Sequence, residues 1–523
     1  MSFKFQINKD VEFSRNKKFL KIAEENKPHL FHQEHLAQRC IKINKEKNQL
    51  QTINEEPSIS NLDSKILGKG DYLILDFGDH FVSHFSINIK RHGSLMDAPL
   101  TLKLQFAEVP DELLHESSNY NGWLSSSWIA EERVHIDQLP TKLRLPRRYS
   151  FRYVKITVLD TSPKWKISLD SPSVTSESSV DENNMPQINT EDPELQKITE
   201  ISIKTLAECM QDVFEDGPKR DQRLWLGDLH LQALVNYTTF KNYSLVKRCL
   251  YLFAGMTTSN GKLSADIFTN NQQVNADDTF LFDYSLFFVS CLKDYLENSD
   301  DKKTVMDLYS VAKNQIDLAR KYVSHNGKLN LPQDWPAFID WGDDLDKSTA
   351  AQAVLIKVLR DFINLNNQLG FKTDDDYFVL LDSMVSYSIQ NLFDEKTKMF
   401  ISNGELNIYS QIWMALANVL PKDENIKLMN KTYKKFFPVQ NVATPYMYHF
   451  IVEALLQNGM KKEGTALIKD YWGKMISLGA DTFWEAFKPD DLNFSPYGSP
   501  LVNSYCHAWA CTPVYLIEKY NLR

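Results

Sequence analysis

One short segment of the sequence, residues 215–228, carries many of the side-chain types that acid–base chemistry uses. It reads EDGPKRDQRLWLGD, and its Gly-Pro pair prevents a continuous helix, so we expect a loop between two apolar helical stretches. Loops held on a rigid scaffold commonly carry catalytic groups, although a solvated loop of salt bridges would have a similar composition. The candidate residues of this loop are Asp216, Arg220, Asp221, Trp225 and Asp228.

A second candidate is Glu485, which stands alone as an acid in the aromatic run TFWEAF. A carboxylate among Phe and Trp side chains is costly to bury unless it is paired or used in chemistry. Trp484 precedes it, and His507 follows in the apolar run 503–509. A glutamate at the solvent edge of an aromatic cluster and a core histidine are the plainer interpretations of these two residues.

A third group interleaves acids with tryptophans in the run DWPAFIDWGDD, where we single out Asp340 and Trp341. Carboxylates bind sugar hydroxyls and indole rings cover the apolar face of a sugar, so this pattern predicts a carbohydrate subsite. Calcium ligation by Asp343 and Asp344 is a competing use, although the spacing of an EF-hand is absent. Asp283, followed by Tyr284, adds a further acidic and aromatic pair.

The elements that must position these residues fall into two classes. Residues 1–60 give no firm assignment, and we treat them as an N-terminal elaboration. Short alternating runs without intervening helices predict a β-sandwich over residues 61–175, and the polar stretch 176–191 reads as a linker. Residues 192–523 show helical periodicity in about twelve segments, which favours six helical hairpins in an (α/α)6 toroid, with a helical repeat array as the alternative.

Composition limits the class of protein. Of the 523 residues, 43% are hydrophobic and 24% charged, which argues against general disorder. A net charge of -9 weighs against a nucleic-acid partner. No apolar stretch reaches the roughly 20 residues that span a bilayer, and the start does not resemble a signal peptide, so we expect a cytoplasmic enzyme without a membrane partner. The scattered cysteines lack any CxxC pair, which indicates reduced core residues.

Together, these motifs resemble glycoside hydrolase family 78, the bacterial and fungal α-L-rhamnosidases. The toroid of that family carries a loop of the form Asp-x-Pro-x-Arg, then an acid, then Trp-x-Gly-Asp. The matching residues here are Asp216, Pro218, Arg220, Asp221, Trp225, Gly227 and Asp228. Trp484-Glu485 and His507 are similar to later elements of the family, and the segment 74–78 resembles the sandwich before its toroid. The resemblance covers about residues 70–523.

The chain departs from the family pattern at two points. The family commonly has Glu where this chain has Asp221, and an alignment shifted by one residue would put Gln222 in the position of the acid. We prefer Asp221, because it directly follows Arg220 and keeps the interval from the acid to the tryptophan. The chain also stops at Arg523, soon after the last predicted helix, so we expect the usual C-terminal β-domain to be absent.

The resemblance implies that the protein releases terminal α-L-rhamnose with inversion, using Asp221 as general acid and Glu485 as general base. It implies no cofactor and no metal, and its partner would be a small-molecule or oligosaccharide rhamnoside, with a homo-oligomer possible. Two alternatives stay open: a toroid hydrolase or lyase for another sugar, and a carbohydrate-binding protein that has lost catalysis. The implied substrate contacts are Asp216, Arg220, Trp225, Asp228, Asp283, Asp340, Trp341, Trp484 and His507.

Overall fold

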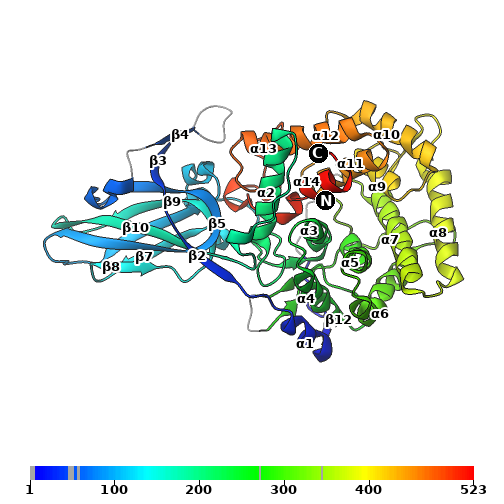
Figure 1. Ribbon diagram of the computed structural model, residues 1–523, viewed down its shortest axis with the longest axis horizontal. Helices are drawn as coiled ribbons and strands as arrows, with labels where there is room; N and C mark the ends of the chain where they lie inside the picture. The colour runs from blue at the N-terminus through cyan, green and yellow to red at the C-terminus, as the bar shows by residue number, and fades with distance from the viewer. Residues whose placement is uncertain (1–5, 45–51, 56–58, 270–272, 343–344) are drawn as a thin grey trace.

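The computed structural model describes residues 6–44, 52–55, 59–269, 273–342 and 345–523. Figure 1 shows a sheet-rich domain, coloured blue to cyan, beside a larger helical domain that runs from green to red. The predicted order, a β domain followed by an α domain, is confirmed.

The sheet-rich domain is built on one long strand, β5 (Tyr72–Gly93), which pairs antiparallel with β9 (Tyr149–Asp160) and β10 (Trp165–Ser178). In its second half Phe85, Ile87 and Ile89 are buried while the residues between them are partly exposed, as expected for a strand with one core face. The other strands of this sheet include β2 (Phe31–Leu36), β3 (Arg39–Asn44), β4 (Thr52–Glu55), β6 (Leu100–Ala107), β7 (Glu131–Ile136) and β8 (Thr141–Arg144).

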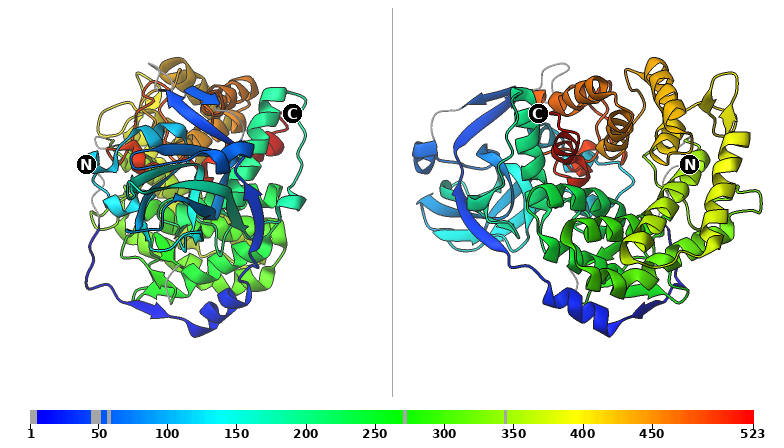
Figure 2. Two further views of the ribbon diagram at one scale, coloured as in Figure 1. Left: turned by 90° about the vertical axis from the view of Figure 1, so that its left-hand side faces the viewer. Right: turned by 45° about the vertical axis from the view of Figure 1, so that its right-hand side comes forward.

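The N-terminal residues, which the sequence left unassigned, join both domains. Strand β1 (Phe13–Arg15) pairs with β12 (Met256–Thr258), and α1 (Lys17–Glu25) packs on α4 (Tyr243–Ala254), so this part belongs to the helical side. Strands β2 and β3 then enter the sheet of the other domain. In Figure 2 this dark blue segment runs along the lower edge of the molecule from one domain to the other.

The helical domain is a closed ring of paired helices. Each inner helix contacts the next, and α14 contacts both α11 and α3, which closes the ring. The inner helices are α3 (Leu226–Thr238), α5 (Phe282–Ser299), α7 (Ser348–Leu369), α9 (Ile408–Leu416), α11 (Pro445–Gln457) and α14 (Pro513–Lys519). The outer helices are α2 (Pro193–Cys209), α4, α6 (Lys302–Ala319), α8 (Asp375–Tyr387), α10 (Lys422–Phe436) and α12 (Lys461–Ile468). Within the described residues, none of the helices is both long and apolar enough to cross a membrane.

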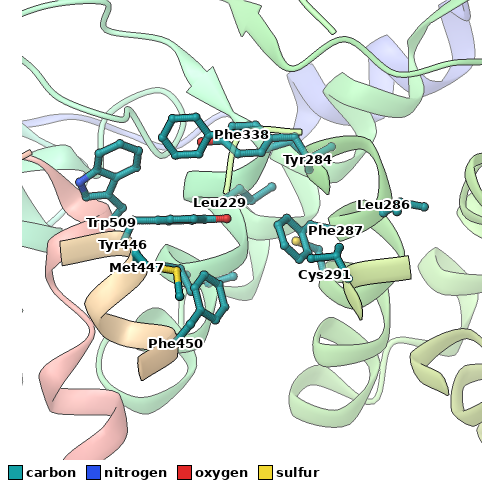
Figure 3. Close-up of a cluster of buried hydrophobic side chains, with 14 of the residues drawn as sticks. Leu229, Tyr284, Leu286, Phe287, Cys291, Phe338, Tyr446, Met447, Phe450 and Trp509 are labelled. Carbon is teal, nitrogen blue, oxygen red and sulfur yellow. The ribbon is translucent and has the colours of Figure 1, made fainter. Parts of the chain in front are cut away.

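Aromatic side chains fill the centre of the ring. Phe287 from α5 and Phe450 from α11 both pack against Trp413 from α9, with ring centroids 6.1 and 4.3 Å away. Figure 3 shows a further layer of Tyr446 and Trp509 near them. Because these residues are almost fully buried, the interior of the ring is a packed core rather than a channel.

Buried ion pairs join the two domains. His80 on β5 contacts Glu208 on α2, and its Nε2 lies 3.1 Å from Glu108, just after β6. Arg148, just before β9, donates to Glu215 at 2.7 Å, and Arg152 on β9 donates to Asp481 at 2.8 Å. Charged groups with so little water around them are stable only when they are paired, so these contacts fix how the domains dock.

The imidazole of His80 is held in its charged form. Burial favours the neutral ring, but the carboxylates of Glu208 and Glu108 outweigh burial and raise the pKa of His80 well above its ordinary value of 6.5. A raised folded-state pKa adds stability that is fully present below the unfolded pKa and is lost as the pH rises through the folded pKa.

We therefore expect His80→Ala to destabilise the protein by about 3 kcal/mol at about pH 6, because it removes the imidazolium that both Glu108 and Glu208 contact. Thermal unfolding of both proteins across the pH range measures this, and the difference between them should shrink in alkaline solution. His92→Ala is the matched control, since His92 lies on the same strand but is exposed. Equal losses in the two variants, or a difference independent of pH, would contradict the assignment of a charged His80.

Candidate active site

A cavity of about 220 Å³ opens where loops of the helical ring meet the sheet-rich domain. Phe338 and Trp509 line it, stacked with their centroids 5.9 Å apart, and Tyr446 packs against both from the core. The cavity therefore has a rigid aromatic wall, continuous with the core drawn in Figure 3. The cavity also brings together eight residues singled out in the sequence: Asp216, Arg220, Asp221, Trp225, Asp228, Trp341, Glu485 and His507.

Arg220 is the central cation of this cavity. Its Nη2 donates to both carboxylate oxygens of Glu485, at 2.6 and 2.7 Å, and its Nη1 donates to Asp221 Oδ1 at 3.1 Å. Its Nε donates to the carbonyl of Val502 at 3.1 Å. The ring of Tyr497 covers the guanidinium, with its centroid 4.2 Å away. One buried side chain thus fixes the positions of both candidate carboxyl groups.

Glu485 is held as a carboxylate. Burial favours its neutral form, but the charge of Arg220 outweighs burial, with help from His507 and the hydroxyl of Tyr497, and the pKa of Glu485 is lowered. Its backbone is fixed as well: its N–H donates to the carbonyl of Ser504 at 3.0 Å, and Trp509 Nε1 donates to its carbonyl at 2.9 Å. An ionised and rigidly placed carboxylate is suited to accept a proton.

Two further acids beside His507 have raised pKa values, in contrast to Glu485. Asp216 and Asp228 each have a carboxylate oxygen 3.7 Å from the imidazole of His507. Burial raises the pKa of Asp216 and raises that of Asp228 well above its ordinary value, despite the opposing effect of the imidazole. Burial favours the neutral form of His507. The carboxyl groups of Asp216, Glu485 and Asp228 outweigh burial and raise the pKa of His507. The cavity therefore places groups whose pKa values are raised beside Glu485, whose pKa is lowered.

Asp221 occupies a strained turn. Its φ is +65° and that of Gln222 is +52°, in the left-handed region that few residues other than glycine adopt. Asp221 lines the cavity, whereas the amide of Gln222 turns back and donates to the carbonyl of Pro218 at 2.7 Å. Of the two residues that the sequence left as competitors for the acid position, Asp221 is thus the one beside Arg220 and the cavity. Strain of this kind often marks functional positions.

Three predicted substrate contacts lie away from the cavity. Asp283 accepts hydrogen bonds from the N–H groups of Phe338 and Ile339, both at 2.9 Å. Asp340 accepts from Thr444 Oγ1 at 2.7 Å and from two further donors. These two buried acids hold the loop that carries Phe338 and Trp341, so they position the cavity wall.

Trp484 is the third of these residues. Its ring packs edge-on against Phe487 and Tyr505, each at 5.3 Å between centroids, and it is 3% exposed. It supports the loop of Glu485 from behind and does not line the cavity. Asp343 and Asp344, considered above as calcium ligands, lie outside the described residues.

The sequence did not single out several residues that line the cavity. Tyr497 donates a short hydrogen bond to Glu485, and Trp123 and Trp128 reach the cavity from the sheet-rich domain. The tryptophans lie in the run NGWLSSSW, an unusual concentration of indoles in a polar loop. That composition could have marked the loop as a candidate binding element. Nothing in the sequence, however, connects it to Glu485 and Tyr497, which lie far along the chain.

One group of described residues has the composition of a metal site. Ligand atoms of His80, Glu208 and Cys506 all lie within 4.8 Å of one another. None of the three lines the active-site cavity. The ion pairs of His80 with its two glutamates account for this group, with the imidazolium as the cation.

Comparisons with known proteins agree with this geometry. Residues 37–176 match the family profile described as the glycosyl hydrolase family 78 alpha-rhamnosidase N-terminal domain. Residues 183–520 match that of the bacterial alpha-L-rhamnosidase 6 hairpin glycosidase domain. No curated protein matches the chain.

Among solved structures, a rhamnosidase from Klebsiella oxytoca with rhamnose bound is 41% identical, with a TM-score of 0.95 over 98% of this chain and 100% of that one. A family 78 rhamnosidase of Bacillus sp. GL1 is 20% identical, with a TM-score of 0.74 over 90% of this chain and 50% of its own. The latter similarity concerns the fold alone. The cavity, the two profile matches and the Klebsiella structure lead to one conclusion: the chain belongs to glycoside hydrolase family 78, the α-rhamnosidases, and is a glycosidase.

Proposed function

We propose that this protein is an inverting α-L-rhamnosidase that releases terminal L-rhamnose from α-L-rhamnosides. The observation that carries the proposal is the placement of Asp221 and Glu485 on two different nitrogens of Arg220. With a guanidinium between them, the two carboxyl groups do not touch. Inverting glycosidases hold their two carboxyl groups about 6.5–9.5 Å apart, which leaves room for the attacking water. The rhamnose bound to the Klebsiella oxytoca relative supports the choice of sugar.

In this mechanism Asp221 donates its proton to the glycosidic oxygen as the bond from that oxygen to C1 breaks. Glu485 takes a proton from a water molecule, whose oxygen attacks C1 from the opposite face. The products are the free alcohol and β-L-rhamnose. The lowered pKa of Glu485 suits the base, because that residue must begin the reaction ionised.

The remaining residues of the cavity would bind the sugar. Asp216, Asp228, Arg220 and His507 offer hydrogen-bonding groups for hydroxyls. Trp225 and Trp341 offer ring faces to the apolar side of the sugar and to its methyl group. These groups are buried and already held in place before the sugar binds. Such a preorganised site favours the distorted sugar of the transition state, because the protein groups need to move little during the reaction.

We expect Asp221→Asn and Glu485→Gln each to lower kcat on an aryl α-L-rhamnoside by about 10²- to 10⁴-fold, because each removes one proton-transfer group. Proton NMR of the first product formed by the native protein should show β-L-rhamnose. Initial formation of the α anomer would show retention and overturn the inverting assignment.

Two controls test the identity of the acid and the identity of the sugar. Adding Gln222→Glu to Asp221→Asn should not restore activity, since the side chain of residue 222 turns back toward Pro218. A panel of other aryl glycosides checks the sugar: turnover of a different sugar with none of the rhamnoside would favour another specificity on the same fold.

We also expect Tyr497→Phe to shift the acidic limb of kcat/KM to higher pH by about one unit, because a hydrogen bond to the ionised form of Glu485 is lost. Without that donor the carboxylate form of Glu485 is less favoured, so the pKa of Glu485 rises. The base then becomes protonated at a higher pH, which moves the acidic limb upward. A pH–rate series on the native protein and the variant measures the shift. Tyr433→Phe, on outer helix α10, is the control, and an unmoved acidic limb in Tyr497→Phe would exclude Glu485 as the group that titrates.

A further inference from the structure

One part of the cavity has no role in the mechanism above. Between β6 and β7, the sheet-rich domain extends a segment, residues 120–128, that we name the rim segment. Its side chains Trp123, Leu124 and Trp128 line the same cavity as Glu485. The site is therefore completed by a domain that supplies neither of the proposed catalytic carboxyl groups.

The rim segment is fixed to the loop that carries Tyr497. Trp123 Nε1 donates to the carbonyl of Pro496 at 2.9 Å, and its backbone N–H donates to the carbonyl of Tyr497 at 3.2 Å. Gly122 permits this approach, because a Cβ there would lie 2.7 Å from the carbonyl oxygen of Tyr497. The hydroxyl of Tyr120 donates to the carbonyl of Leu124 at 2.9 Å. The segment is thus a preformed wall of the site.

The catalytic groups are buried, whereas the rim segment is partly exposed. Glu485 is 4% exposed, Tyr497 is 3% exposed, and Trp123, whose ring centroid lies 5.7 Å from that of Tyr497, is 40% exposed. A rhamnosyl unit must reach the buried carboxyl groups to react. The leaving group must therefore point outward, where the rim tryptophans meet solvent.

The chemistry of the rim segment favours an aromatic leaving group. Both N–H groups of Trp123 donate to backbone carbonyls, so its indole presents mainly a ring face to a ligand. Leu124 and the partly exposed Trp128 add apolar surface. Two other acids that line the cavity already have partners: Asp278 accepts from the backbone N–H of Asn8 at 2.6 Å, and a carboxylate oxygen of Asp277 lies 3.9 Å from Arg223. A leaving sugar would need hydroxyl partners, whereas a flat ring needs surfaces on which to stack.

We infer that the rim segment is the leaving-group subsite and that Trp123 and Trp128 select α-L-rhamnosides whose leaving group is a flat aromatic ring system. This inference rests on the proposed rhamnosidase function. The sheet-rich domain is then a specificity element of the enzyme, and the indole of Trp123 is its main contact.

The test compares three substrates of the whole protein: 2-naphthyl α-L-rhamnoside, a rhamnosyl-glucose disaccharide, and α-L-rhamnosyl fluoride, whose leaving group is too small to reach the rim. We expect Trp123→Ala to lower the ratio of kcat/KM for the naphthyl substrate to that for the fluoride by about fivefold to tenfold, mostly through KM, since a stacking contact is lost. Trp123→Phe should recover most of the ratio. Leu114→Ala is the matched control, an exposed apolar residue before the rim segment that does not line the cavity, and it should leave the ratio as it is.

Each outcome bears on the inference. Equal losses on the naphthyl substrate and the fluoride would overturn it, because Trp123 would then act only by supporting Tyr497. A larger loss on the disaccharide than on the naphthyl substrate would also overturn it, in favour of a sugar subsite. If the native protein hydrolysed no rhamnoside, including the fluoride, the proposed function itself would fail, which is a separate result.

Discussion

The active site depends on the buried contact between Arg220 and Glu485. Each charge would be expensive to bury alone, and each is stable here because the other lies within 2.6 Å. The pair joins the loop before α3 to the loop before α14, two segments far apart in the chain. Tyr497, twelve residues after Glu485 in the same connection, covers the guanidinium and donates to the carboxylate. The geometry of the cavity follows from satisfying these two charges.

The same physical requirement joins the domains. Lys219, next to Arg220 in the chain, makes a buried ion pair with Glu112 and donates to the carbonyl of Asn503 at 2.7 Å. Glu112 lies in η2 (Pro110–Leu114), a few residues before the rim segment. The loop before α3 therefore holds Glu485 through Arg220 and holds the sheet-rich domain through Lys219. Docking of the domains and assembly of the cavity are parts of one network of buried charges.

Environment, rather than residue type, separates the roles of the acids. Glu485 faces Arg220, and its pKa is lowered, whereas Asp228 is buried without an equally strong cation, and its pKa is raised. Burial favours the neutral form of both, so the difference comes from the placement of the guanidinium. Carboxyl groups that are chemically alike can therefore hold a proton on one side of His507 and lack one on the other.

The order of the two domains could be predicted from the sequence alone, because alternating strands and helical periodicity are local patterns. The sequence also marked the loop 215–228 and Glu485, since a dense charged loop and a lone acid among aromatics stand out in any context. The folded chain was needed to show that Asp283 and Asp340 accept backbone hydrogen bonds that hold a loop, and that Trp484 packs behind the site. It alone brought Tyr497, Trp123 and Trp128 to the cavity. Composition shows that a residue can serve a site, but contact between segments distant in the chain arises from packing, which leaves no local pattern.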